Sequence, residues 1–300
     1  MTAPLFCGLS AFPITPTDAT GRLVEADFVA IIERICAAGA DSIGILGSTG
    51  GFAYLDRNAR RRAIALAVTT ARGRVPIIAG IGALRTDATV ALAHDSMEAG
   101  ATAVLLAPMA YLPLTAAEVE VHFRTVAQAT PLPLCIYNNP ATTRFTFTPD
   151  LLHRLAALPT VAAVKMPPPE NGDFAAELAQ LRAAQIGSLR IGYSADWSLA
   201  PALSSGADAF YSGLAGILPD PFVALAKVAQ GGDAMATAAA NQRFESLWSL
   251  SHEFGGLRLS FAIAQVLGLS AAQPPLPILP LQAGVSARIV QALREVTVAG

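Results

Sequence analysis

One lysine of this chain stands where an amine could carry out covalent chemistry. Lysines and arginines together number 20, but only Lys165 and Lys227 are lysines. Lys165 ends an apolar run that begins at residue 161, and Met166 and three prolines follow it. An ammonium at the end of a buried strand is costly unless the site uses it. Loss of water favours the neutral amine, which can attack a carbonyl and form a Schiff base. The alternative is a lysine that only extends its amine to solvent.

Two further groups could assist such an amine. Gly47, Ser48 and Thr49 follow a second apolar run, and their hydroxyls and open backbone N–H groups can hold a carboxylate or phosphate oxygen. Tyr137 ends a third apolar run and could relay protons beside an amine. Taken singly, the glycine-rich segment also fits an ordinary tight turn, and Tyr137 also fits a ring packed against a helix. The combination is more specific than any one part.

The elements that must position these residues follow a repeated pattern. An amphipathic helix ends at glycine and a short apolar strand follows, in residues 38–46, 99–106 and 205–211. Apolar strands that alternate with helices predict a parallel sheet covered on both faces. Eight such strands predict a closed (β/α)8 barrel, an α/β fold. The expected strands are residues 6–14, 42–46, 75–79, 103–106, 132–137, 161–165, 189–192 and 209–211.

The C-terminal part of the chain has a different pattern. Residues from about 221 to 300 indicate helices, broken by a proline-rich loop at 274–280. This region is longer than one helix that closes a barrel. We therefore expect a barrel in residues 1–220 and a helical extension in 221–300, packed on the barrel without a core of its own.

Composition excludes several classes of function. Hydrophobic residues make up 53% of the chain and the net charge is -2, with no basic stripe, so nucleic acid is not an expected partner. The three cysteines and four histidines are too scattered for a disulfide framework or a metal motif. We expect no signal peptide, because the first residues lack a basic region followed by an apolar core, and no uninterrupted apolar stretch reaches about 18 residues. We expect a cytoplasmic protein without a membrane partner.

Active sites of such barrels lie at the carboxyl ends of the strands. The glycine-rich turn that begins at Gly47, the segment Tyr137-Asn138-Asn139-Pro140 and Lys165 fall at these ends of the second, fifth and sixth strands. In these segments the chain closely resembles the dihydrodipicolinate synthase / N-acetylneuraminate lyase superfamily of class I pyruvate-dependent aldolases. The resemblance covers essentially the whole length.

The resemblance implies a lyase or aldolase that works through a Schiff base. Lys165 would form an imine with pyruvate or a related 2-oxo acid. Ser48 and Thr49 would hold the carboxylate of that acid, and Tyr137 would relay protons. We therefore expect Lys165, Tyr137 and Ser48 to be catalytic. Contacts with substrate are expected at Ser48, Thr49, Gly47, Tyr111, Gly192 and Tyr211, the last through its carbonyl.

The resemblance also predicts partners. They are a small 2-oxo acid and an aldehyde, and further copies of the chain in a homotetramer built as a dimer of dimers. No metal or organic cofactor is expected, because the covalent imine on Lys165 serves as the electron sink.

Several positions depart from the superfamily pattern. Dihydrodipicolinate synthases usually carry an arginine that binds the carboxylate of the aldehyde. Thr142 occupies that position here, and Arg144 lies two residues further on. Ser194 and Ala195 stand where sialic-acid lyases carry an acidic pair. These changes weaken the assignment of either best-known activity, dihydrodipicolinate synthase or sialic-acid lyase, to this chain.

Other departures affect the proton relay and the second-substrate side. Gly51 replaces a usual glutamate, and Ala110, followed by Tyr111, replaces a tyrosine that often enters the relay of a neighbouring subunit. The second-substrate side is more apolar than usual, with Ala110, Met166, Pro167 and Ala195. We hypothesise a less polar aldehyde partner, or a dehydratase or hydratase-aldolase role.

Three interpretations of the sequence remain open. The first is the Schiff-base lyase, with a 2-keto-3-deoxy sugar acid aldolase or dehydratase as an alternative within the superfamily. The second is a low-activity paralogue that binds a 2-oxo acid, since the relay is incomplete at Ala110. The third is a phosphate-handling barrel that uses residues 47–51 as an anion cradle. Phosphate sites in barrels more often follow strands 7 and 8, and residues 192–196 form no glycine-rich loop. Retention of Lys165, Tyr137 and both hydroxyls favours the first reading.

Overall fold

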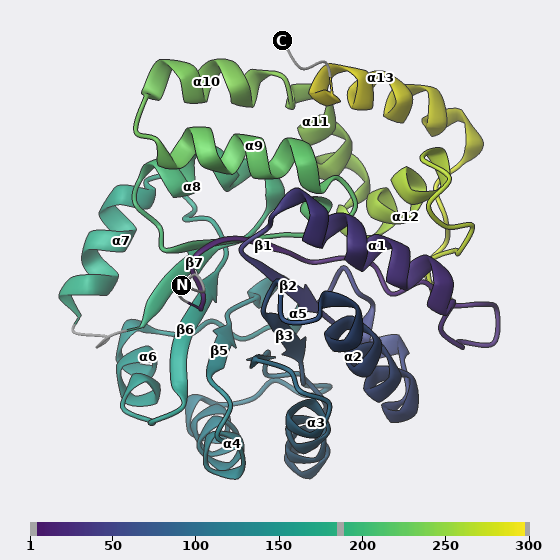
Figure 1. The fold of residues 1–300 in the computed structure, drawn as a ribbon. Coiled ribbons are helices and arrows are strands. Elements are labelled where there is room, and N and C mark those ends of the chain that lie inside the picture. The colour runs from purple at the N-terminus through teal and green to yellow at the C-terminus, as the bar shows by residue number, and fades with distance from the viewer. Residues whose placement is uncertain (1–4, 185–188, 298–300) are drawn as a thin grey trace.

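Eight parallel strands close into a barrel surrounded by helices (Figure 1). The computed structural model describes residues 5–184 and 189–297. Each strand pairs with the next along the chain, and the first pairs with the last. The (β/α)8 prediction is therefore confirmed. Residues 1–4, 185–188 and 298–300, which fall inside the predicted barrel and extension, lie outside the described residues.

The strands are short and buried at nearly every position, as a parallel sheet covered by helices requires. Their carboxyl ends meet at one end of the barrel, which is where the sequence placed the site. The apolar run at 6–14 is longer than its strand, because the chain leaves the sheet after residue 11. The strands are β1 (Gly8–Ala11), β2 (Ser42–Ile45), β3 (Ile77–Gly80), β4 (Ala103–Leu106), β5 (Leu134–Tyr137), β6 (Val161–Met166), β7 (Arg190–Tyr193) and β8 (Ala209–Ser212).

Capping side chains and glycines set the ends of several helices of the ring. Thr115 caps α4 with its side chain and forms a capping box with Glu118. The three glycines of the repeat, Gly39, Gly100 and Gly206, all have positive φ, so each ends its helix in the conformation that glycine favours. The helices are α1 (Glu25–Ala38), α2 (Arg57–Ala71), α3 (Thr86–Glu98), α4 (Ala116–Ala129), α5 (Pro140–Thr143), α6 (Pro149–Ala156), α7 (Phe174–Ala183), α8 (Leu199–Ser204) and α9 (Pro219–Gln230).

The C-terminal region is helical and lies on one side of the ring (Figure 1). Helix α9 packs against both α1 and α8, so it occupies the place of the eighth ring helix. Beyond it come α10 (Ala234–Gln242), α11 (Glu245–Phe254), α12 (Gly256–Val266) and α13 (Ser286–Thr297). The proline-rich loop falls between α12 and α13. The division of the chain at residue 220 stays a prediction.

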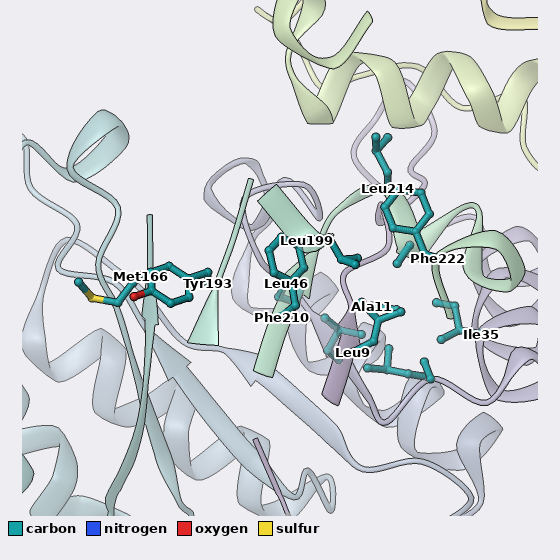
Figure 2. Packing of buried hydrophobic residues seen from close by; sticks show 14 of the residues in the cluster. Leu9, Ala11, Ile35, Leu46, Met166, Tyr193, Leu199, Phe210, Leu214 and Phe222 are labelled. Atoms are coloured by element: carbon teal, nitrogen blue, oxygen red, sulfur yellow. The ribbon is translucent and has the colours of Figure 1, made fainter. Parts of the chain in front are cut away.

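The core has two layers. The larger layer lies between strands and helices, and Figure 2 shows part of it, with Leu9 from β1, Phe210 from β8 and Phe222 from α9. The smaller cluster fills the barrel itself and includes Phe12, Tyr137 and Tyr211 among its members. The inner cluster therefore forms the floor beneath the carboxyl ends of the strands. None of the described helices is both long and apolar enough to cross a bilayer.

Candidate active site

Lys165 lies on β6 with its side chain inside the barrel mouth. Only 5% of the residue is exposed. Its amine Nζ lies 4.1 Å from the centre of the Tyr137 ring, 4.4 Å from that of Phe12 and 5.6 Å from that of Tyr211. Aromatic faces attract an ammonium and hold it in place without consuming its lone pair once it is neutral.

Among the described residues, the amine of Lys165 forms no ion pair. Every ion pair within residues 5–184 and 189–297 uses an arginine. A buried amine held by rings rather than by an ion pair keeps its nitrogen available for attack on a carbonyl. This is the arrangement that a Schiff-base lysine needs.

Strand pairing places Tyr137 beside Lys165. The two residues are partners in the register of β5 and β6. The next residue, Asn138, ties the strand ends together: its backbone N–H donates to the Lys165 carbonyl at 3.0 Å, and its side-chain amide donates to Met166 Sδ at 3.5 Å. The relative position of phenol and amine is therefore set by sheet hydrogen bonds rather than by a loop.

The Tyr137 hydroxyl connects two loops at the mouth. It accepts a hydrogen bond from the Asn139 amide at 3.0 Å and lies 3.5 Å from Ser48 Oγ, with either oxygen able to donate. Ser48 is half-buried, so the pair reaches the open side of the site. These two hydroxyls can pass a proton between Tyr137, whose ring lies beside the buried amine, and the mouth of the barrel.

The turn after β2 is held tightly in place. Leu46 has φ of 57°, in the left-handed region that a branched side chain rarely adopts. A Cβ on Gly47 would lie 2.6 Å from Phe12 Cδ1, and a Cβ on Gly213 would lie 2.6 Å from Thr49 Oγ1. The turn is thus clamped between the segments that follow β1 and β8, with Ser48 and Thr49 half-exposed above the floor. Strain at such a turn is typical of functional loops.

Gly192, the register partner of Lys165 on β7, packs against Tyr211. A Cβ on Gly192 would come within 2.5 Å of Tyr211 Cε2, so the glycine makes room for the ring. The Tyr211 hydroxyl lies 3.6 Å from Cys135 Sγ inside the barrel. Burial raises the pKa of Tyr211 well above its ordinary value and that of the Cys135 thiol to about 12. Both groups therefore stay protonated and form part of the floor. The expected contacts of Gly192 and Tyr211 with substrate stay predictions.

Tyr111 is separate from the other predicted residues. It lies in the loop between β4 and α4, and 89% of it is exposed. The side chain is therefore not packed into the barrel mouth of its own chain, and its contact with a substrate stays a prediction.

The positions that depart from the superfamily pattern surround the mouth. Thr142 and Arg144 are exposed around the short helix α5, and Arg144 ends it with φ of 54°. Ser194 uses its hydroxyl to donate to the Met166 carbonyl at 3.1 Å, which ties β7 to β6. In Figure 2, Met166 lies beside Tyr193, its partner in the strand register. The β6–β7 side is therefore closed by apolar and backbone contacts.

One buried acid was missed by the sequence analysis. Asp196 lies in the 3-10 turn η2 (Asp196–Ser198) after β7, and its carboxylate accepts hydrogen bonds from Ser212 Oγ and from the Leu214 N–H. Burial raises the pKa of this carboxyl, and the two hydrogen bonds and the charge of Lys165 oppose the rise. The sequence feature that could have identified Asp196 is an acidic residue close after an apolar strand.

The described part of the chain contains no group of three His, Cys, Asp or Glu side chains arranged to hold a metal ion. The expectation that the site works without a metal or organic cofactor stays a prediction.

Comparisons with known proteins agree over almost the full length. The model of the dihydrodipicolinate synthetase family matches residues 5–296. A 4-hydroxy-tetrahydrodipicolinate synthase of Phenylobacterium zucineum is 29% identical, over 98% of this chain and 99% of the relative. Another from Salinibacter ruber is 32% identical, over 78% of this chain and 76% of the relative. The crystal structure of a dihydrodipicolinate synthase from Agrobacterium tumefaciens has a TM-score of 0.96 and 51% identity, over 97% of this chain and 98% of that chain.

Proposed function

Because the chain belongs to the dihydrodipicolinate synthetase family, we propose that Lys165 forms an imine with pyruvate or a related 2-oxo acid. The resemblance seen in the sequence is confirmed by the match to the family, and so is the prediction of an enzyme of the class I aldolase type. The identity of the substrates and the role of each residue are our proposal.

The observation that carries the proposal is the environment of the Lys165 amine. It is buried, lies 4.1 Å from the Tyr137 ring, and takes part in none of the ion pairs of the described residues. The hydroxyls of Tyr137 and Ser48 lie 3.5 Å apart and connect this region to the half-exposed turn. These positions, all at one end of the barrel, support roles as nucleophile, proton relay and carboxylate donors.

The steps follow from these groups. The neutral amine attacks the ketone carbon of the 2-oxo acid, and the carbinolamine loses water to give an imine. The methyl carbon then gives a proton to the Tyr137 oxygen, which the loss of water has left deprotonated, and the electron pair is held as an enamine. The enamine forms a carbon–carbon bond to an aldehyde, whose oxygen takes up a proton. Water finally hydrolyses the imine and restores the amine. Cleavage is the same sequence in reverse.

Different residues around the amine bind the carboxylate and transfer the protons in these steps. Ser48, Thr49 and the backbone N–H groups of their turn hold the carboxylate of the acid. Tyr137 donates the proton that the leaving hydroxyl needs and accepts one when water returns. Ser48 carries that proton onward across the 3.5 Å contact.

The second substrate differs from that of the best-known superfamily members. Thr142 supplies no cation for an acidic aldehyde, and Ser194 donates to a backbone carbonyl instead of binding sugar hydroxyls. Pro167, half-buried directly after β6, adds apolar surface, whereas Met166 is buried in the layer between strands and helices. These features support a less polar aldehyde, or a dehydratase or hydratase-aldolase reaction on the same imine. We further propose that the enzyme acts in the cytoplasm as a homotetramer without a cofactor.

The test is reductive trapping. The protein is incubated with pyruvate and sodium borohydride and then mapped by peptide mass spectrometry. We expect a stable adduct on Lys165 that is lost in Lys165→Ala and retained in Lys227→Arg. Labelling by other 2-oxo acids but not by pyruvate would support imine formation on Lys165, with a different 2-oxo acid as the substrate. A chain that no 2-oxo acid labels would leave Lys165 with a structural role and overturn the proposal.

A further inference from the structure

We propose that Asp196 is a positioning residue for the carboxylate of the substrate, which acts through the turn after β8 on Thr49. This inference rests on the proposed function, because it assigns Asp196 a part in binding the 2-oxo acid. Asp196 itself lies behind the site, and its effect is carried by the backbone that it holds.

One carboxylate oxygen of Asp196 organises the end of β8. Oδ1 accepts a hydrogen bond from Ser212 Oγ and another, at 3.2 Å, from the N–H of Leu214. Ser212 Oγ in turn accepts from the N–H of Ala215 at 2.9 Å. Asp196 therefore fixes the last residue of the strand together with the start of the 3-10 turn η3 (Leu214–Gly216).

The backbone held in this way touches Thr49. Gly213 lies between the two residues that Asp196 binds, and a Cβ at Gly213 would meet Thr49 Oγ1 at 2.6 Å and Thr49 Cβ at 3.5 Å. No side chain separates the turn from the threonine. A shift of the turn therefore moves the hydroxyl that is expected to hold the carboxylate.

A second contact leads from the same turn toward Lys165. A Cβ at Gly216 would meet the backbone of Phe12 and Pro13 at 2.4 Å. The Phe12 ring lies 4.4 Å from the Lys165 amine. The turn after β8 thus supports both the carboxylate donor and one ring of the aromatic cage around the amine.

The burial of Asp196 argues that the contact is specific. Only 6% of the residue is exposed, and a buried carboxyl is costly unless its hydrogen bonds are satisfied. An asparagine could accept the same two hydrogen bonds through its amide oxygen. Alanine could not, and would leave the Ser212 hydroxyl and the Leu214 N–H without their acceptor.

The experiment measures the pyruvate concentration that gives half-maximal borohydride trapping on Lys165, together with the maximal extent. We expect Asp196→Ala to raise the half-saturating concentration by about tenfold, as loss of buried hydrogen bonds does, while the maximal extent at saturating pyruvate is kept. Asp196→Asn is expected to remain near the wild type, and Ser212→Ala to follow Asp196→Ala in part. Asp95→Asn is the matched control, because Asp95 is buried but pairs with Arg57 on the helices outside the barrel.

A coupling test separates positioning from general destabilisation. In a Thr49→Val background, Asp196→Ala is expected to change the half-saturating concentration little, because the group that it positions is already gone. Additive effects of the two changes would overturn the inference, and so would a folded Asp196→Ala with wild-type half-saturation. If Asp196→Ala does not fold, unchanged half-saturation in Ser212→Ala overturns it. A wild-type chain that no 2-oxo acid labels would instead remove the proposed function, and this inference with it.

Discussion

Lys165 and Tyr137 are register partners on neighbouring strands, and the amine of one lies 4.1 Å from the ring of the other. Because hydrogen bonds of the sheet set this distance, it does not depend on the conformation of a loop. Sites built on strands hold their groups more precisely than sites built on loops. Ser48 and Thr49 lie instead on the turn after β2, which packs against Phe12 and Gly213.

Removal of the Tyr137 hydroxyl tests the proton relay. Tyr137→Phe keeps the ring beside Lys165 but removes the oxygen that lies 3.5 Å from Ser48 Oγ. We expect exchange of the pyruvate methyl protons for deuterium, followed by NMR, to slow by about 10²–10⁴-fold, the range for loss of a general acid–base group. The trapped adduct on Lys165 should still form after long incubation, because the nucleophile is intact.

The control for this change is Tyr54→Phe, which removes a hydroxyl from a tyrosine that is 46% exposed. It should exchange protons at the wild-type rate. An exchange rate in Tyr137→Phe within about twofold of the wild type, far below the usual effect of such a group, would remove Tyr137 from the relay.

The fit between Gly192 and Tyr211 predicts a packing defect with a functional effect. In Gly192→Ala the new Cβ would lie 2.5 Å from Tyr211 Cε2 and 2.7 Å from the Ala209 carbonyl oxygen, so the ring must move. Overpacking of this kind costs about 1–3 kcal/mol. We expect the free energy of unfolding to fall by that amount in urea, and trapping on Lys165 to slow because Tyr211 forms part of its cage. Gly284→Ala is the matched control, because its Cβ would meet no atom within 4 Å. Equal stability of the two variants would contradict the prediction.

The sequence was sufficient to predict the site residues whose positions follow from strand ends alone. Lys165, Tyr137 and Ser48 each end or follow an apolar run, and closure of the barrel then brings them together. Asp196 could not be found in this way, because its partner Ser212 lies 16 residues further along the chain and belongs to the next strand. The packing role of Gly192 likewise depends on which ring faces it from β8. The exposure of Tyr111 depends on the conformation of a loop, which periodicity does not describe.

Acid should destabilise the fold through His122. Burial lowers the pKa of this histidine below its ordinary 6.5, and its Nδ1 lies 2.9 Å from Thr86 Oγ1. The unfolded chain therefore binds the proton more readily than the folded chain. The stability due to the neutral ring is complete above pH 6.5 and is lost as the pH falls from 6.5 through the lowered folded value.

The measurement is the melting temperature of the wild type and of His122→Gln between about pH 8 and about pH 5. The wild type should lose more stability over this interval than His122→Gln does. His94→Gln, at an exposed position, is the control and should follow the wild type. Parallel curves for the wild type and His122→Gln would show that another group is responsible for the loss.

The preference for the aldehyde can be changed at position 142. Thr142 is exposed on α5, which directly follows Asn139, the donor to the Tyr137 hydroxyl. A guanidinium introduced there would pair with a carboxylate on the incoming aldehyde through two parallel hydrogen bonds. We expect Thr142→Arg to raise kcat/KM for aldehydes that carry a carboxylate, relative to uncharged aldehydes of the same size, by about tenfold or more, as a charge-assisted hydrogen bond provides.

Thr142→Gln, which is polar but uncharged, is the control. Both chains should form the pyruvate adduct on Lys165 equally well, because the change affects only the second substrate. A wild type that already prefers the acidic aldehydes would instead show that Arg144 or another group supplies the cation, and the proposal of a less polar partner would be wrong.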